Sequence, residues 1–233
     1  MRNLDDLRWL GLAWEEPVVR QSRRMDLYGE ALRRLADLGV VYPCFCTRKE
    51  IRAEIEASAG APHAVAPDGS AVYPGICRAL DAAERDDRIA AGRPHALRLD
   101  ATRARRLTGE LSWTDGEHGR QAVCLDRFGD VVIARKEIAT SYHLAVVVDD
   151  AAQEVTHVTR GEDLFEATHV HRTLYALLDL PVPLWHHHAL CRDDQGRRLA
   201  KRQGAATIRS LRERGHSPDD VMAMARPSSA PSP

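Results

Sequence analysis

The second half of the chain alternates between helix-like and strand-like segments, and this alternation limits the folds that it can adopt. A helical pattern over residues 165–178 ends at Asp179-Leu180-Pro181. Residues 185–190 then form a strand-like run that leads into a basic loop. Helices that alternate with strands favour a parallel sheet covered by helices. We therefore predict an α/β fold for this half of the chain.

The basic loop contains Lys201, in the segment Gly196-Arg197-Arg198-Leu199-Ala200-Lys201-Arg202. Lysine is rare here, because only Lys49, Lys136 and Lys201 are lysines among 33 basic residues. An ammonium group acts as a mobile point charge toward phosphate, so the loop predicts contact with a polyphosphate. The alternative is a solvated basic turn.

Charge and length exclude some classes of protein. With 33 basic and 34 acidic residues, the formal net charge is −1, so no overall basic field indicates a nucleic acid. An RNA partner would have to meet a local arginine patch, for which the candidates are Arg20, Arg23 and Arg24, or Arg103, Arg105 and Arg106. No apolar run approaches the roughly 18 residues of a membrane span, and Asp5 and Asp6 are unlike a secretory signal. We expect a cytoplasmic monomer.

Three of the five cysteines predict a metal site. Cys44 and Cys46 flank a single residue, and Cys77 lies 31 residues further on. Two thiolates in a Cys-x-Cys turn can reach one ion, and zinc favours such sulfur-rich sites. His63, within the intervening loop, could supply the fourth ligand. The alternative is a set of buried free thiols. We expect Cys124 and Cys191 to be isolated core or surface residues.

The N-terminal part predicts helices, and one later segment predicts a strand. Ser22 can cap a helix that Gly39 follows, and an earlier helix has apolar residues at helical spacing, namely Leu4, Leu7, Leu10 and Trp14. In the run His186-His187-His188, neighbouring side chains of a strand point to opposite faces, so only His186 and His188 can share one.

Three segments of the second half resemble one family of enzymes. They are residues 140–150, Val158-Thr159-Arg160-Gly161-Glu162-Asp163 and Arg198-Leu199-Ala200-Lys201-Arg202. Together they resemble the C-terminal half of the catalytic domain of class I glutamyl-tRNA synthetases. The last segment is similar to the Lys-Leu-Ser-Lys-Arg form of that class's signature loop. Arg198 and Ala200 replace its first lysine and its serine, whereas Lys201 matches its second lysine.

Two upstream segments resemble the short members of this family, the glutamyl-Q tRNA(Asp) synthetases. They are Tyr42-Pro43-Cys44-Phe45-Cys46-Thr47-Arg48-Lys49-Glu50 and Tyr73-Pro74-Gly75-Ile76-Cys77-Arg78. The resemblance covers residues 4–214. It implies ATP-dependent activation of glutamate and its transfer to the queuosine base of tRNA(Asp). The implied partners are glutamate, ATP with Mg²⁺, and tRNA(Asp) that carries queuosine.

The resemblance also implies roles for individual residues. Arg160 would hold the side-chain carboxylate of glutamate, and Tyr142 would line the same pocket. Lys201 would bind ATP and act as the catalytic cation on its triphosphate. The zinc ligands would be Cys44, Cys46, Tyr73 and Cys77, with Tyr73 in place of His63. The alternatives are an ion pair of Arg160 with Glu162 or Asp163, and ordinary core packing of Tyr142.

The segment boundaries follow from the same resemblance. The chain contains no His-x-Gly-His segment, so we expect an incomplete class I Rossmann-type catalytic domain with a zinc-binding α+β insertion. The predicted parts are a helical remainder of the first Rossmann half (1–39), the insertion (40–138), the second half with the lysine loop (139–206), a helical C-terminus (207–225) and a disordered tail (226–233). Alternatives are a catalytically dead zinc-binding module for RNA or a partner, and a truncated glutamyl-tRNA synthetase.

Overall fold

The computed structural model describes residues 2–57, 65–67, 69, 71–191 and 207–225, and the chain divides into two compact units. The larger unit is Arg20–His187, and the smaller one combines Met1–Val19 with His188–Pro233. None of the described helices is long and apolar enough to cross a membrane. The predicted segment boundaries follow a different division and stay predictions.

The described part of the smaller unit contains three short helices, α1 (Arg2–Trp9), α8 (Ile208–Glu213) and α9 (Pro218–Met224). The guanidinium of Arg212 lies over the Trp9 ring, 5.5 Å from its centroid. The sequence predicts a longer first helix, but α1 ends before Gly11, whose φ of 78° is left-handed. Trp14 therefore lies outside the helix.

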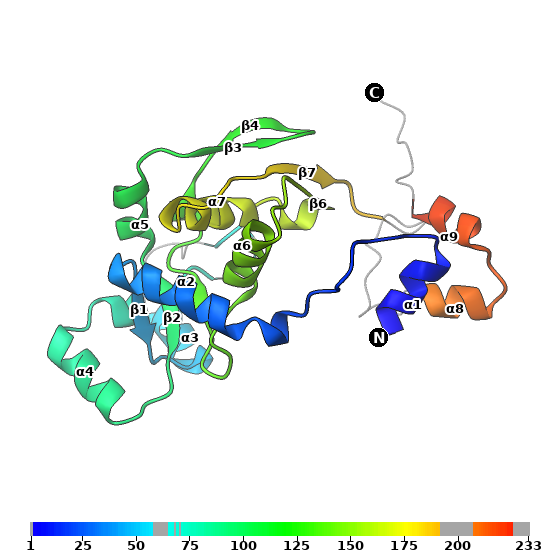
Figure 1. Cartoon of the computed structure of the whole chain (residues 1–233). Helices are drawn as coiled ribbons and strands as arrows, with labels where there is room; N and C mark the ends of the chain where they lie inside the picture. The colour runs from blue at the N-terminus through cyan, green and yellow to red at the C-terminus, as the bar shows by residue number, and fades with distance from the viewer. Residues whose placement is uncertain (1, 58–64, 68, 70, 192–206, 226–233) are drawn as a thin grey trace. The chain divides into compact units, whose positions relative to one another are not determined.

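A three-stranded antiparallel sheet lies in the first part of the larger unit (Figure 1). Its strand order is β1-β2-β5, and Val41 pairs with Leu99. The strands are β1 (Val41–Cys44), β2 (Ala96–Leu99) and β5 (Val132–Ala134). The accompanying helices are α2 (Met25–Asp37), α3 (Arg48–Ala57), α4 (Ala82–Ala90) and α5 (Ala101–Thr108).

A four-stranded sheet with the order β4-β3-β7-β6 forms the second layer of strands. β3 pairs in parallel with β7 and antiparallel with β4. In the parallel pair, Asp115 lies opposite Trp185. The strands are β3 (Ser112–Asp115), β4 (Gly119–Ala122), β6 (His157–Gly161) and β7 (Leu184–His188), accompanied by α6 (Tyr142–Ala152) and α7 (Ala167–Leu177). The alternation of helices and strands after residue 142 is thus confirmed, and so is the α/β fold class.

Side-chain capping sets the start of some helices in this unit, but not of α2 or α7. The hydroxyl of Ser141 accepts from the backbone N–H of Leu144, so α6 begins at Tyr142. The predicted cap at Ser22 is wrong, because a 3₁₀ turn occupies Gln21–Arg23 and α2 begins at Met25. Gln21 in that turn donates to Asp149 at 2.9 Å. This tertiary contact overrides the local capping preference.

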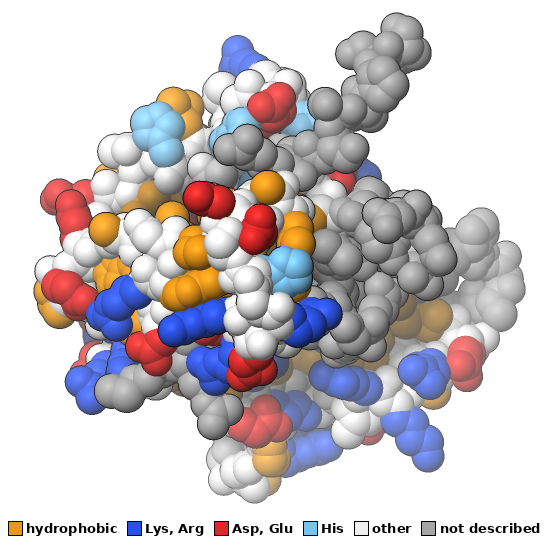
Figure 2. Space-filling model, turned by 90° about the vertical axis from the view of Figure 1, so that its right-hand side faces the viewer, with side chains coloured by type: hydrophobic (Ala, Val, Ile, Leu, Met, Phe, Trp, Pro, Cys, Tyr) orange, Lys and Arg blue, Asp and Glu red, His pale blue; other side chains and the backbone are white. Residues whose placement is uncertain are grey.

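The main core lies between α2, α6, α7 and the strands, and it contains fully buried side chains such as Leu35, Leu144 and Leu174. A second, smaller core combines Tyr42, Cys44, Phe45, Tyr73 and Cys77. On the face of the molecule drawn in Figure 2, basic and acidic side chains are interspersed, as the near-zero net charge predicts.

Candidate functional site

Arg160 lies on β6, and its guanidinium donates hydrogen bonds to five groups of the described residues. Nε donates to His187 Nε2 at 3.0 Å. Nη1 donates to His171 Nδ1 at 3.1 Å and to Tyr142 Oη at 3.3 Å. Nη2 donates to Thr168 Oγ1 at 2.6 Å and to the Leu164 carbonyl at 3.2 Å. The alternative prediction, an ion pair with Glu162 or Asp163, is not among these contacts.

The environment of Arg160 is unusual for a cation. Burial lowers the pKa of its guanidinium, which is oriented by two imidazoles, two hydroxyls and one carbonyl. An arginine stays protonated under all physiological conditions. The site therefore contains a half-buried positive charge whose hydrogen-bond partners among the described residues carry no negative charge. These contacts use all five N–H groups of the guanidinium, so a carboxylate can pair with it by replacing the exposed hydroxyl of Tyr142.

Tyr142, the first residue of α6, brings its hydroxyl to the exposed edge of the Arg160 guanidinium. Its side chain is 42% exposed, so the alternative prediction of core packing is wrong. Beside it, a cavity of about 350 Å³ is lined by residues of β2, β5 and α6, among them Arg98, Arg135, Ser141, Tyr142 and His143. Tyr142 and Arg160, which are 18 residues apart in sequence, are thus brought together.

Four residues that the sequence analysis did not single out complete this site: His187, His171, Thr168 and Asp115. The side chain of Asp115 is fully buried and accepts from Nδ1 of His187 at 2.6 Å. Burial would raise the pKa of this carboxyl, but hydrogen bonds from the imidazoles of His187 and His118 and from the backbone N–H groups of Glu117 and His118 outweigh it and hold the pKa well below its usual range. For His187, the alternation of side chains along the strand could have indicated a buried position. It puts His187 on the same face of β7 as the buried Trp185.

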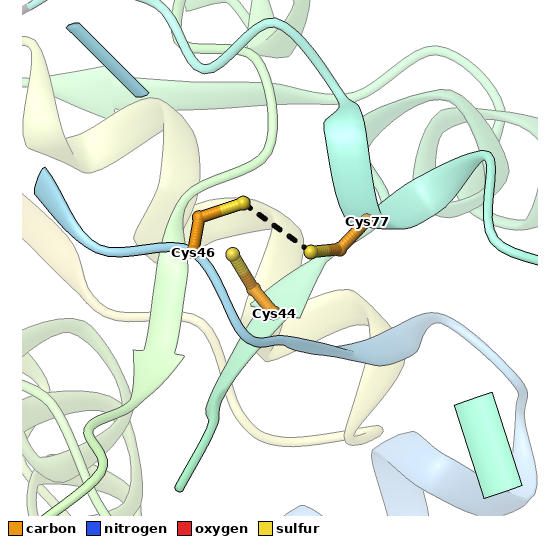
Figure 3. Close-up of side chains that lie close together, drawn as sticks. All are labelled: Cys44, Cys46 and Cys77. Atoms are coloured by element: carbon orange, nitrogen blue, oxygen red, sulfur yellow. Dashed lines mark hydrogen bonds between the residues drawn. The ribbon is translucent and has the colours of Figure 1, made fainter. Parts of the chain in front are cut away.

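The three predicted cysteine ligands converge in the small core (Figure 3). Their sulfur atoms all lie within 4.8 Å of one another, and Cys46 Sγ is 3.4 Å from Cys77 Sγ. The hydroxyl of Tyr73 lies 3.5 Å from Cys44 Sγ and 3.6 Å from Cys46 Sγ. The residues predicted from distant parts of the sequence therefore form one compact group of four donor atoms.

This group has the dimensions of a tetrahedral metal site. A zinc–sulfur distance of about 2.3 Å puts neighbouring sulfurs about 3.8 Å apart in a tetrahedron. Backbone N–H groups also point at the donors, because Phe45 N donates to Cys77 Sγ at 3.3 Å and Cys77 N donates to Tyr73 Oη at 2.8 Å. Such bonds stabilise anionic ligands. The donor set therefore fits zinc.

Burial favours the protonated form of two of these donors, Cys46 and Tyr73. Burial raises the pKa of Cys46 to about 12 and raises that of Tyr73 further still. Cys44 differs, because hydrogen bonds from Tyr73 and Arg98 outweigh burial and lower the pKa of its thiol. A metal ion would have to displace protons from these donors, so its affinity would rise with pH.

Some predicted residues lie outside the described residues. They are the catalytic and ATP-binding Lys201 with its neighbours Arg198 and Ala200, and the alternative zinc ligand His63. Of the other cysteines, Cys124 is exposed and Cys191 is half-buried, and neither belongs to the cluster.

Comparisons with known proteins identify the family of the chain. The family model of the catalytic domain of class I tRNA synthetases (E and Q) matches residues 1–227. The glutamyl-Q tRNA(Asp) synthetase of Rhodobacter capsulatus is 50% identical over 94% of this chain and 78% of its own length. That of Nocardia farcinica is 45% identical over 96% of this chain and 67% of its own length.

A solved structure shows the same fold at lower identity. The glutamate-tRNA synthetase of Elizabethkingia anophelis superposes with a TM-score of 0.70 and 24% identity, covering 87% of this chain and 42% of that one. The chain therefore belongs to the family of class I tRNA synthetase catalytic domains of the glutamate and glutamine type. The names of these relatives do not favour a non-catalytic zinc-binding module.

Proposed function

We propose that the chain is the catalytic part of a ligase that glutamylates the queuosine base of tRNA(Asp). In the first step, the α-carboxylate of glutamate attacks the α-phosphorus of ATP and pyrophosphate leaves. In the second step, the queuosine base takes the glutamyl group and AMP leaves. The observation that carries the proposal is the half-buried guanidinium of Arg160, whose hydrogen-bond partners among the described residues are uncharged, in a chain 50% identical to a glutamyl-Q tRNA(Asp) synthetase.

Within this proposal, each chemical group has one task. Arg160 holds the side-chain carboxylate of glutamate, which replaces Tyr142 Oη as an acceptor of Nη1, and the Tyr142 hydroxyl lines the same pocket. Lys201 contacts the triphosphate of ATP and stabilises the charge that develops as pyrophosphate leaves. Mg²⁺ arrives with ATP rather than in a protein cage. The enzyme is a cytoplasmic monomer.

Zinc has a structural task in the same proposal. Cys44, Cys46, Tyr73 and Cys77 would hold one ion, and the tight grouping of their donor atoms supports this. The small core around them has only five buried residues, so the metal would supply stability that apolar packing there does not. The ion would take no part in the transfer of the glutamyl group.

Glutamate-dependent exchange between pyrophosphate and ATP tests the activation step. The chain should exchange with glutamate but not with glutamine, which lacks the second carboxylate. Arg160→Ala should abolish the exchange, whereas Arg127→Ala, which removes an exposed pair with Glu166, should leave it unchanged. Transfer is then measured with tRNA(Asp) that carries queuosine, against the unmodified tRNA. Folded protein that neither binds glutamate nor exchanges would contradict the proposal.

A further inference from the structure

Two imidazoles orient the guanidinium of Arg160, and each ring has another hydrogen-bond partner on its far side. An arginine can only donate, so His187 Nε2 at 3.0 Å and His171 Nδ1 at 3.1 Å must both accept. An imidazole that accepts at one nitrogen carries its single proton on the other. In each ring, the proton is therefore on the nitrogen that faces away from Arg160.

Asp115 lies behind His187. Its Oδ2 is 2.6 Å from Nδ1 of the ring and 3.2 Å from the backbone N–H of the same residue. Since a carboxylate only accepts, the proton of His187 is on Nδ1 and the lone pair of Nε2 points at Arg160. Thr168 Oγ1, 3.3 Å from the same Nε2, can donate to it as well.

His143 lies behind His171. Its Nδ1 is 3.0 Å from Nε2 of His171. Because Nδ1 of His171 accepts from Arg160, the proton of His171 is on Nε2 and is donated to Nδ1 of His143. The two rings thus hold opposite tautomers, His187 protonated at Nδ1 and His171 at Nε2. A second proton on either ring would place a ring N–H donor opposite an N–H donor of the guanidinium, and the hydrogen bond would be lost. Burial, which lowers the pKa of both rings, disfavours that proton.

Among the described residues, the acidic groups that act on Arg160 do so from a distance. Asp115 is separated from it by the ring of His187. Asp150 acts through space, and its own hydrogen bond is from Tyr175 Oη at 3.4 Å. An adjacent internal carboxylate would orient the guanidinium equally well, but it would neutralise the charge and compete with an anionic ligand.

We propose that His187 and His171 are positioning residues that aim Arg160 without neutralising it. The aimed guanidinium keeps its charge for the side-chain carboxylate of the amino-acid substrate, so the site prefers an acid to its uncharged amide. This inference rests on the proposed function, because that function supplies the carboxylate. Asp115 takes part indirectly by fixing the tautomer of His187.

Substitution of the imidazoles tests the positioning role. His187→Ala and His171→Ala should each raise the KM for glutamate about tenfold, the effect of losing one hydrogen bond to a charged group. The KM for ATP should change less than about twofold. His169→Ala is the matched control, because His169 is also buried on α7 but contacts the Cys124 backbone instead of Arg160. A purely structural role would lower the active fraction of all three variants and leave the KM for glutamate unchanged, which would overturn the inference.

The tautomers can be read without any assay of activity. In a long-range ¹H–¹⁵N correlation spectrum of the labelled full chain at about pH 7, His187 should show a protonated Nδ1 and His171 a protonated Nε2. A proton on Nε2 of His187, or a doubly protonated ring at either position, would overturn the inference. If the expected tautomers are found but the protein does not bind glutamate, the proposed function fails and the substrate assigned to Arg160 fails with it.

Discussion

Acidification should destabilise this fold steeply between about pH 7 and pH 5, because three histidines are buried in uncharged form. His169, His171 and His187 are at most 5% exposed. Burial lowers the pKa of each of them below the ordinary value of 6.5. In the unfolded chain the same rings titrate near pH 6.5. The unfolded state therefore binds more protons than the folded state in this window.

The sign and the size of the effect follow from proton linkage. A histidine whose pKa is depressed by folding contributes its full stability above the unfolded pKa and loses it as the pH falls below that value. Each ring that is protonated only in the unfolded state contributes a slope of about 1.4 kcal/mol per pH unit. Three rings together give up to about 4 kcal/mol per unit, against a total stability of about 5–15 kcal/mol for a typical domain. Asp115, whose pKa is also depressed, adds a loss only at pH values below about 4.

Urea unfolding at several pH values, followed by tryptophan fluorescence, measures this slope. His169→Gln should reduce the slope by about a third, since one of the three rings no longer titrates. His157→Gln, at an exposed position, should leave it unchanged. A slope below about 1 kcal/mol per unit in the parent protein would show that these rings do not remain uncharged in the folded state.

Three further predictions concern the metal group and the core. Cys77→Ser should lower the zinc content of purified protein well below one ion per chain, as measured by atomic emission, because one of four clustered donors is weakened. Leu174→Ala should cost about 2–5 kcal/mol in urea unfolding, whereas the exposed Leu184→Ala should cost less than about 0.5 kcal/mol. Asp149→Ala should cost about 3 kcal/mol in the same assay, because it leaves the buried hydroxyl of Tyr28 without its acceptor.

Local patterns in the sequence were sufficient to predict α7 and β7, two of the elements around the candidate site. The helical spacing over residues 165–178 corresponds to α7, and the strand-like run that follows corresponds to β7. The cysteine cluster could also be predicted, because thiols with metal-ligand spacing are chemically distinctive. Its fourth donor, Tyr73, came only from the resemblance, since a tyrosine at that distance carries no local signal.

The surroundings of Arg160 could not be predicted in this way. Asp115, His171 and His187 come from three separate elements, and no periodic pattern links them. The role of His187 depends on Asp115, which reaches it only because β3 pairs with β7. The predicted cap at Ser22 was wrong for the same reason, namely a contact between residues far apart in the sequence. Gln21 bonds to Asp149, and α2 begins only at Met25.

The register of one parallel pairing therefore places the carboxylate that sets the tautomer of His187. Trp113 and Asp115 lie on the same buried face of β3, and Asp115 pairs opposite Trp185. The Trp113 ring packs edge-on against Trp185 and against His187, with centroids 5.7 and 5.8 Å apart. A slip of one residue would turn both Trp113 and Asp115 to the other face. The slip would expose the indole of Trp113 and would also remove the Asp115 carboxylate from His187. The register that buries the indole is therefore also the register that sets the tautomer of His187.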